Sequence, residues 1–188
     1  MASGIFPDKK IWPRLLAASV AALAVLGLGA CSSSGPNPRK GQPYQYSYQK
    51  GKTARVTQSG YAVAPPGAPA AVKRVIEAGN EICRHPYRMG GGHRKLHDSA
   101  YDCSGSTSYV LNRAGLMKGT MPSKGFRSYG RGGAGDWITV YARNGHVFLV
   151  VAGLRFDTSS QGSGHTGPRW LTKRRATKGF TARHPRGL

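Results

Sequence analysis

The sequence has 188 residues, of which 28 are lysine or arginine and 7 are aspartate or glutamate, so the formal net charge is +21. A chain of this length holds one domain with extensions and excludes two domains of typical size. The charge predicts an anionic partner, such as acidic lipid headgroups or wall polymers. The basic residues form no recognisable nucleic-acid-binding motif, which argues against nucleic acid as the partner.

The N-terminus has the three parts of an export signal: basic residues within the first 14 positions, an apolar run over residues 15–28, and small residues at its end. The run from Leu28 to Cys31 resembles a bacterial lipobox, in which the cysteine is lipidated and becomes the first residue of the mature protein. We expect residues 1–30 to be a lipoprotein signal peptide and Cys31 to carry the lipid. Removing that segment, with its three basic residues and one acidic residue, leaves a formal charge of +19.

A lipidated Cys31 predicts a bacterial cell-envelope protein attached to a membrane. Where the organism has two membranes, the outer one is expected, because Ser32 stands where an aspartate often retains lipoproteins in the inner membrane. Residues 31–68 are rich in serine, glycine, proline, glutamine and lysine and poor in aliphatic residues. This composition predicts a flexible tether.

The catalytic domain is expected over residues 69–188. A helix is predicted from Pro69, because proline suits a first turn and apolar residues recur at helical spacing as far as Ile82, before Pro86. Cys83 lies at the apolar end of this pattern and is expected to be a buried cysteine without a chemical role.

Residues 87–100 are predicted to form a loop whose three consecutive glycines allow close approach to another surface. Its His93, His97 and Asp98 lack the paired spacing of a known zinc site, so a solvated polar loop is favoured. A metal-dependent hydrolase that uses His93, His97 and His165 is the weaker alternative. No metal and no cofactor are expected.

The most informative stretch runs from Tyr101 to Gly115. Asp102 and small hydroxylated residues surround Cys103, and apolar spacing then predicts a helix that ends at Gly115. Cys103 would therefore stand at a helix N-terminus, where the unsatisfied backbone N–H groups favour the thiolate. With a base in reach it becomes a nucleophile.

Residues 138–142 and 147–151, joined by an Asn-Gly turn, predict a β-hairpin with His146 at the start of its second strand. That strand is apolar on both faces and is expected to be central. A two-residue turn at Ala152 and Gly153 would place Val151 opposite Leu154 and bring Asp157 to the face of His146. His165, in the loop that follows, is the alternative partner for His146.

The C-terminal region is predicted to contribute one last strand that closes the sheet, within residues 170–185. The basic run at residues 173–175 is expected to be a solvated surface or a patch that faces anionic wall or membrane.

Four short motifs resemble the NlpC-like family of papain-fold cell-wall peptidases: residues 87–92, 102–105, 135–137 and 145–147, in the order of that family. The resemblance covers about residues 72–188. It implies an α+β fold with N-terminal helices packed on a small antiparallel sheet. It also implies a cysteine peptidase acting on the stem peptides of peptidoglycan, at bonds such as that between D-γ-glutamyl and diaminopimelate.

Carried over residue by residue, the resemblance gives Cys103 as nucleophile, His146 as general base and Tyr87 as a contact to the reacting carbonyl. For the orienting residue, the hairpin register predicts Asp157, and the histidine that many relatives use there makes His165 the alternative. Related folds also act as amidases or acyltransferases, and a non-catalytic wall-binding lipoprotein is the alternative from another class. The pattern does not specify an oligomeric state.

Overall fold

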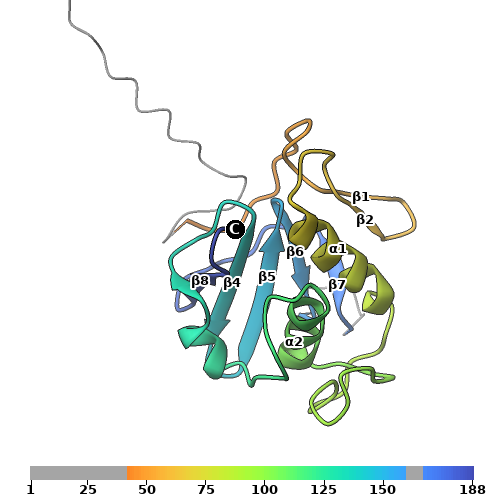
Figure 1. Cartoon of the computed structure of the whole chain (residues 1–188), viewed down its shortest axis with the longest axis vertical. Helices are drawn as coiled ribbons and strands as arrows, with labels where there is room; N and C mark the ends of the chain where they lie inside the picture. The colour runs from red at the N-terminus through yellow and green to blue at the C-terminus, as the bar shows by residue number, and fades with distance from the viewer. Residues whose placement is uncertain (1–41, 160–166) are drawn as a thin grey trace, which may run out of the picture. The chain divides into compact units, whose positions relative to one another are not determined.

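A six-stranded sheet organises the part of the chain described by this computed structural model, residues 42–159 and 167–188 (Figure 1). Its strand order is β3-β8-β4-β5-β6-β7, and every pairing is antiparallel. The strands are β3 (Arg131–Gly132), β4 (Ile138–Arg143), β5 (His146–Val151), β6 (Leu154–Asp157), β7 (Arg169–Leu171) and β8 (Thr181–His184). The predicted signal peptide, Cys31 and His165 lie outside the described residues.

Two α-helices complete an α+β fold within the described residues: α1 (Ala70–Ile82) and α2 (Cys103–Arg113). A short 3₁₀ helix, η1 (Gly125–Ser128), precedes β3, and a small hairpin of β1 (Arg55–Val56) and β2 (Ala62–Val63) precedes α1. The predicted helix after Pro69 and the predicted cysteine helix are both confirmed, and α2 begins at Cys103 itself. No helix among the described residues is long and apolar enough to cross a membrane.

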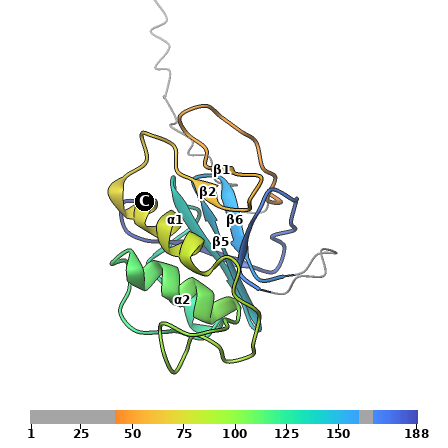
Figure 2. The same ribbon diagram turned by 90° about the vertical axis from the view of Figure 1, so that its right-hand side faces the viewer.

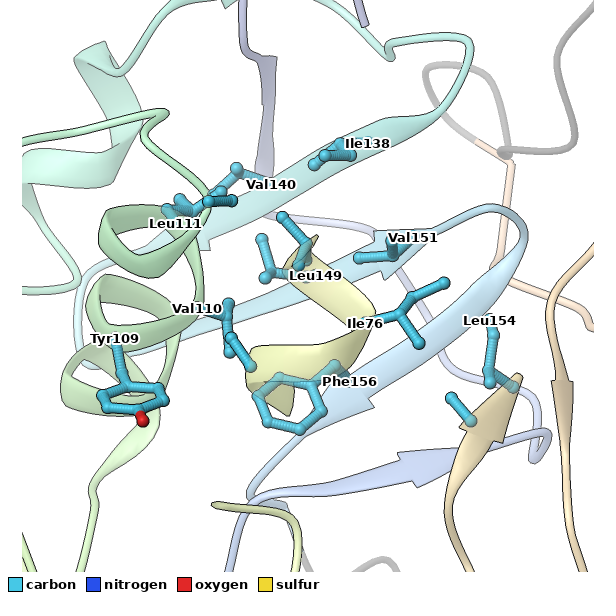
Figure 3. Close-up of a cluster of buried hydrophobic side chains, with 14 of the residues drawn as sticks. Ile76, Tyr109, Val110, Leu111, Ile138, Val140, Leu149, Val151, Leu154 and Phe156 are labelled. Atoms are coloured by element: carbon cyan, nitrogen blue, oxygen red, sulfur yellow. The ribbon is translucent and has the colours of Figure 1, made fainter. Parts of the chain in front are cut away.

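Both helices pack on one face of the sheet (Figure 2). Their apolar stripes meet alternate residues of β4, β5 and β6, and Figure 3 shows this core with Ile76 of α1 and Val110 of α2 directed at the strands. Leu149 and Val151, from the middle strand, are completely buried there. Burial of this face fixes which side of β5 is left for His146, because side chains alternate along a strand.

The hairpin register agrees with the sequence prediction. Arg143 pairs with His146 across the first turn, and Val151 pairs with Leu154 across the second. Both residues of the second turn, Ala152 and Gly153, have positive φ, as two-residue turns of type I′ require. With Leu149 opposite Phe156, the next residue along β6 projects to the face of His146.

The other face of the sheet is covered by segments from the two ends of the described chain. Tyr44 is completely buried, in a cluster with Tyr141, Phe148 and Val150 against which Phe180 also packs. The predicted flexible tether is therefore wrong for residues 42–68, which form part of the folded unit. The reason is that Tyr44 covers the apolar face of β5 opposite the helices, whereas Ala54, Ala62 and Ala68 pack in the core on the helix side.

Tyr44 is bound by its hydroxyl as well as by packing. The hydroxyl donates to the Leu171 carbonyl oxygen at 3.1 Å and accepts the Arg155 N–H at 3.2 Å. Its backbone pairs in both directions with Arg175, at 2.8 and 3.0 Å. A segment just downstream of the predicted lipid attachment site thus bridges β6, β7 and the loop that follows them.

Tyr44→Phe is expected to lower the free energy of unfolding by about 1–3 kcal/mol, because it leaves the buried Arg155 N–H and the Leu171 carbonyl without their partner. Urea denaturation followed by circular dichroism measures this. Tyr48→Phe is the matched control, since Tyr48 is 56 % exposed and should change stability by less than about 0.5 kcal/mol. Equal stability of the two variants would contradict the bridging role of Tyr44.

The C-terminal region differs from the prediction of one closing strand. It forms two short strands on different parts of the sheet: β7 pairs with β6, and β8 lies between β3 and β4. The chain between them, residues 172–180, crosses the face opposite the helices, which is why the two strands cannot be one. This crossing brings Arg175 and Phe180 to the side of the sheet that carries His146.

Candidate functional site

Asp102 caps the N-terminus of α2 and so fixes the position of Cys103. Its Oδ1 accepts the backbone N–H groups of Ser104 and Gly105 at 2.9 and 2.7 Å, and its Oδ2 accepts that of Gly90 at 2.9 Å. Burial alone would raise the pKa of this carboxyl, but the bonds from these donors outweigh burial and lower it. The ionised cap stabilises the first helical turn and holds the loop against it.

The triple-glycine loop packs on the first turn of α2, as the sequence predicted for close backbone approach. A Cβ placed on Gly105 would lie 1.9 Å from the Gly91 carbonyl oxygen, and one on Gly91 would lie 2.4 Å from the Ala100 oxygen. Only glycine fits at both positions. The loop therefore acts as a close-fitting support for the turn that carries Cys103.

His146 lies between the thiol and a buried carboxylate. Its Nε2 is 2.9 Å from Asp157 Oδ1, and the Cys103 side chain lies close enough to the ring to raise its pKa. Because Nε2 is taken by Asp157, Nδ1 is the nitrogen left for the thiol. The predicted contact between Asp157 and His146 is confirmed.

The protonation of His146 follows from these contacts. Burial alone lowers its pKa, but the hydrogen bond and negative charge of Asp157, together with the interaction with the Cys103 side chain, outweigh burial and raise it to about 9. The imidazolium is therefore the favoured form at neutral pH.

Asp157 is fully buried and is held by more than His146. Its Oδ2 lies 3.1 Å from Arg175 Nη1 and 3.7 Å from Arg155 Nη1, and Ser159 donates to both of its oxygens. Arg169, on β7, is the cross-strand partner of Asp157. Burial alone would raise the pKa of Asp157, but the bond from His146 and the charge of Arg175 outweigh it and keep the carboxyl ionised.

Tyr87 lies near the thiol. A parallel backbone bridge joins it to Tyr101, just before the cap, and it is partly buried. Burial, followed by the negative charges of Cys103 and Asp102, raises the pKa of its hydroxyl, which stays a neutral donor. Its hydroxyl lies 3.8 Å from Met89 Sδ, a weak interaction that a stronger acceptor can replace.

Most backbone N–H groups in the first turn of α2 are already hydrogen-bonded and cannot donate to a ligand. The Ser104 and Gly105 N–H groups are bound by the Asp102 side chain, and the Ser106 N–H by the Asp102 carbonyl. Within the described part of the chain the Cys103 N–H has no hydrogen-bond partner. Cys103 N–H and the Tyr87 hydroxyl are thus the two donors that can face an oxyanion at the thiol.

The remaining polar candidates make other contacts, and of these His93 touches the two residues that flank Cys103. His93 Nε2 contacts Asp102 and Ser104 at 3.2 and 3.0 Å, Asp98 is paired with Arg88 at 2.7 Å, and His97 packs edge-on against Tyr109. Over residues 42–159 and 167–188, no three metal-ligating side chains come together. His165 falls in the segment outside these ranges.

Cys83 and Cys103 are both free and buried. Burial raises the pKa of the Cys83 thiol, which disfavours its thiolate, and the thiol donates to the Asn80 carbonyl oxygen. Cys83 also lines a cavity of about 760 Å³ at the end of α1, with Arg84, His85 and Trp170. Its place agrees with the expected buried cysteine.

Sequence reasoning missed the arginines behind Asp157. Arg155 is completely buried and lies on the same face of β6 as Asp157, two residues away, so strand alternation could have revealed it. Arg175 was expected in a solvated basic run, but it is 8 % exposed, with its guanidinium 4.8 Å from the Phe148 ring centroid. No local signal separates it from its neighbours in the run, because its burial depends on the distant strand β5.

The arrangement as a whole brings a thiol, an imidazole and a carboxylate into one chain of contacts at a helix N-terminus. Such a group can form an acyl intermediate on sulfur and move a proton between sulfur and a leaving group. No protein-family model matches the sequence, and no curated protein matches it either.

Proposed function

We propose that this chain is a cysteine peptidase that hydrolyses amide bonds in the stem peptides of peptidoglycan, with a papain-like NlpC-type domain that also includes the folded residues 42–68. The observation that carries the proposal is His146, which is hydrogen-bonded to the buried carboxylate of Asp157 and lies beside the Cys103 side chain. The choice of substrate rests on the resemblance of the four sequence motifs.

In the proposed reaction, the Cys103 thiolate attacks the carbonyl carbon of the peptide bond, and the carbonyl oxygen takes the negative charge. The Cys103 N–H and the Tyr87 hydroxyl donate to that oxygen. The His146 imidazolium then gives its proton to the departing amine, which leaves a thioester on Cys103. A water molecule, deprotonated by His146, attacks the thioester and releases the acid and the thiol.

Asp157 keeps the imidazole oriented through this cycle. Its hydrogen bond to Nε2 directs Nδ1 at the sulfur and stabilises the imidazolium. The two arginines beside it keep the carboxyl ionised, so that it stays an acceptor towards His146.

The test is incubation of the purified protein with muropeptides, followed by mass spectrometry. Cleavage gives two fragments whose masses add up to the substrate and one water, and Cys103→Ala gives none. Transfer of an acyl group to an added amine would indicate an acyltransferase on the same fold. Retention on purified sacculi without any product would instead favour the non-catalytic wall-binding lipoprotein.

Localisation to the cell envelope is part of the proposal and is supported by the sequence of residues 1–31 alone. We propose a bacterial lipoprotein, anchored in a membrane through Cys31, whose basic mature chain lies against anionic wall polymer. Labelling with a fatty-acid analogue, wild type against Cys31→Ser, tests the anchor, and equal labelling of the two would remove it.

Activity is expected to fall as pH rises through about 9, the pKa of His146, because the imidazole then lacks the proton that the leaving amine needs. The folded pKa is above the unfolded value of about 6.5, so the stability that the charged histidine contributes is also complete below pH 6.5 and lost through 9. Initial rates between pH 6 and 10.5, with circular dichroism at each pH, measure both. An alkaline limb near 6.5 would contradict the contacts of His146.

A further inference from the structure

A shallow hollow of about 320 Å³ lies beside the strand that carries His146. It is lined by Arg127 from η1, Arg143 and Asn144 at the β4–β5 turn, and Gly179 and Thr181 around the start of β8. Arg143 is the cross-strand partner of His146. The hollow therefore adjoins the proposed catalytic group on the β4 side.

Arg143 is held in place by an aromatic ring that also contacts the histidine. Its guanidinium carbon lies 4.7 Å from the centroid of Phe180, and the Phe180 ring meets His146 edge-on with centroids 6.2 Å apart. A guanidinium stacked on a ring loses less freedom on binding a ligand than a mobile side chain does. The stacking thus prepares Arg143 for a partner next to the reacting atoms.

The hollow is rich in donors and has positive charge in excess. Over the described residues neither Arg127 nor Arg143 forms an ion pair, and the nearby Asp157 is already bound to His146, Arg155 and Arg175. The Asn144 amide and the Thr181 hydroxyl add further donors at the rim. Two guanidinium groups with neutral donors suit a carboxylate, which a guanidinium binds with two parallel hydrogen bonds.

We infer that this hollow binds a free carboxylate of the peptide substrate close to the scissile bond, with Arg143 as its main ligand and Arg127 as the second. The inference rests on the proposed function and extends it to specificity. Stem peptides that carry a free carboxylate near the cleaved amide would be preferred over otherwise identical peptides in which it is amidated. Arg143 and Arg127 would contribute to substrate binding and leave the chemistry at Cys103 unchanged.

The test uses two synthetic γ-D-glutamyl-diaminopimelate peptides that differ only in the α-carboxyl of the D-glutamyl residue, free in one and amidated in the other. Wild type is expected to have a kcat/KM at least about tenfold higher for the free acid. Arg143→Gln and Arg127→Gln should each raise KM for the free acid by about tenfold, with kcat little changed. The ratio of kcat/KM for the free acid to kcat/KM for the amidated peptide should then approach one. Arg131→Gln, an exposed arginine on β3, is the matched control and should keep the wild-type preference.

Binding to Cys103→Ala, measured by calorimetry, separates this inference from the proposed function. Selective binding of the free acid without cleavage by wild type would reject the peptidase and support the hollow as a carboxylate site. Cleavage of both peptides with equal kcat/KM would overturn the inference and leave the peptidase standing. An equal rise in KM for both peptides in Arg143→Gln would also overturn it, because the arginine would then act through packing. Tighter binding of inorganic phosphate than of acetate to Cys103→Ala would reject the carboxylate assignment.

Discussion

Replacement of Asp157 by asparagine is expected to lower kcat/KM for wall peptides by up to about 10⁴-fold, the size of loss seen when the aspartate of a serine-histidine-aspartate triad becomes asparagine. The cause is the contact of 2.9 Å between Asp157 Oδ1 and His146 Nε2. An amide there neither stabilises the imidazolium nor selects the ring orientation that directs Nδ1 at Cys103. The alkylation rate of Cys103 by iodoacetamide should fall with it.

His165→Ala provides the comparison, because His165 was the alternative partner of His146 in the sequence. It is expected to change either rate by less than about tenfold, or roughly 1.4 kcal/mol of activation free energy. Measurement of both rates in both variants decides between the two residues. A large loss in His165→Ala with little loss in Asp157→Asn would show that the observed contact does not operate during turnover. If neither variant is slowed while Cys103→Ala is inactive, Cys103 and His146 work as a pair.

The second large effect concerns stability, and it arises at the same residue. Asp157→Asn is expected to lower the free energy of unfolding by about 3–5 kcal/mol, the usual cost of removing one partner from a buried ion pair. Arg175 Nη1 at 3.1 Å and Arg155 Nη1 at 3.7 Å would keep their charges and lose the carboxylate that neutralises them. Urea denaturation of wild type and variant measures the change, which must be known before the loss of activity is interpreted.

A double-variant cycle with Arg175→Gln isolates this charge effect. If Asp157 and Arg175 stabilise each other, the double variant should be more stable than the sum of the two single losses predicts, by about 0.5–3 kcal/mol. Arg174→Gln is the matched control, since Arg174 is exposed and one residue away. Strict additivity of Asp157→Asn and Arg175→Gln would contradict a stabilising pair, and the low activity of Asp157→Asn would then be attributable to His146 alone.

The contacts that the sequence predicted well are those decided by neighbours in the chain. Asp102 precedes the helix by one residue and accepts the N–H groups two and three positions later. Its capping role therefore depends only on neighbouring residues in the sequence. Ala152 and Gly153 form the two-residue turn on which the prediction depended, and the pairing of Val151 with Leu154 then sets the side of every later residue in β6. The meeting of Asp157 and His146 could be predicted because both follow from one tight turn.

The burial of residues 42–68 could not be predicted from neighbouring residues. Its polar composition predicted a tether, yet Tyr44 is completely buried in the cluster with Phe148 and Val150, and its hydroxyl bonds Leu171, 127 positions later, and Arg155, 111 positions later. Composition measures how much apolar surface a segment has, but burial depends on which surface is left uncovered elsewhere. Here that surface is the second face of β5.

The sequence by itself therefore determined the thiol at a helix start, the hairpin, and the histidine and carboxylate on one face. The tertiary structure decided what surrounds them: the arginines behind Asp157, the cover over the second sheet face, and the hollow at Arg143. The physical reason is the distance along the chain over which each interaction acts. Caps and turns are fixed by hydrogen bonds within a few residues, whereas a buried charge and its counter-charge are brought together only when segments such as β6 and the chain around Arg175 pack on the same sheet.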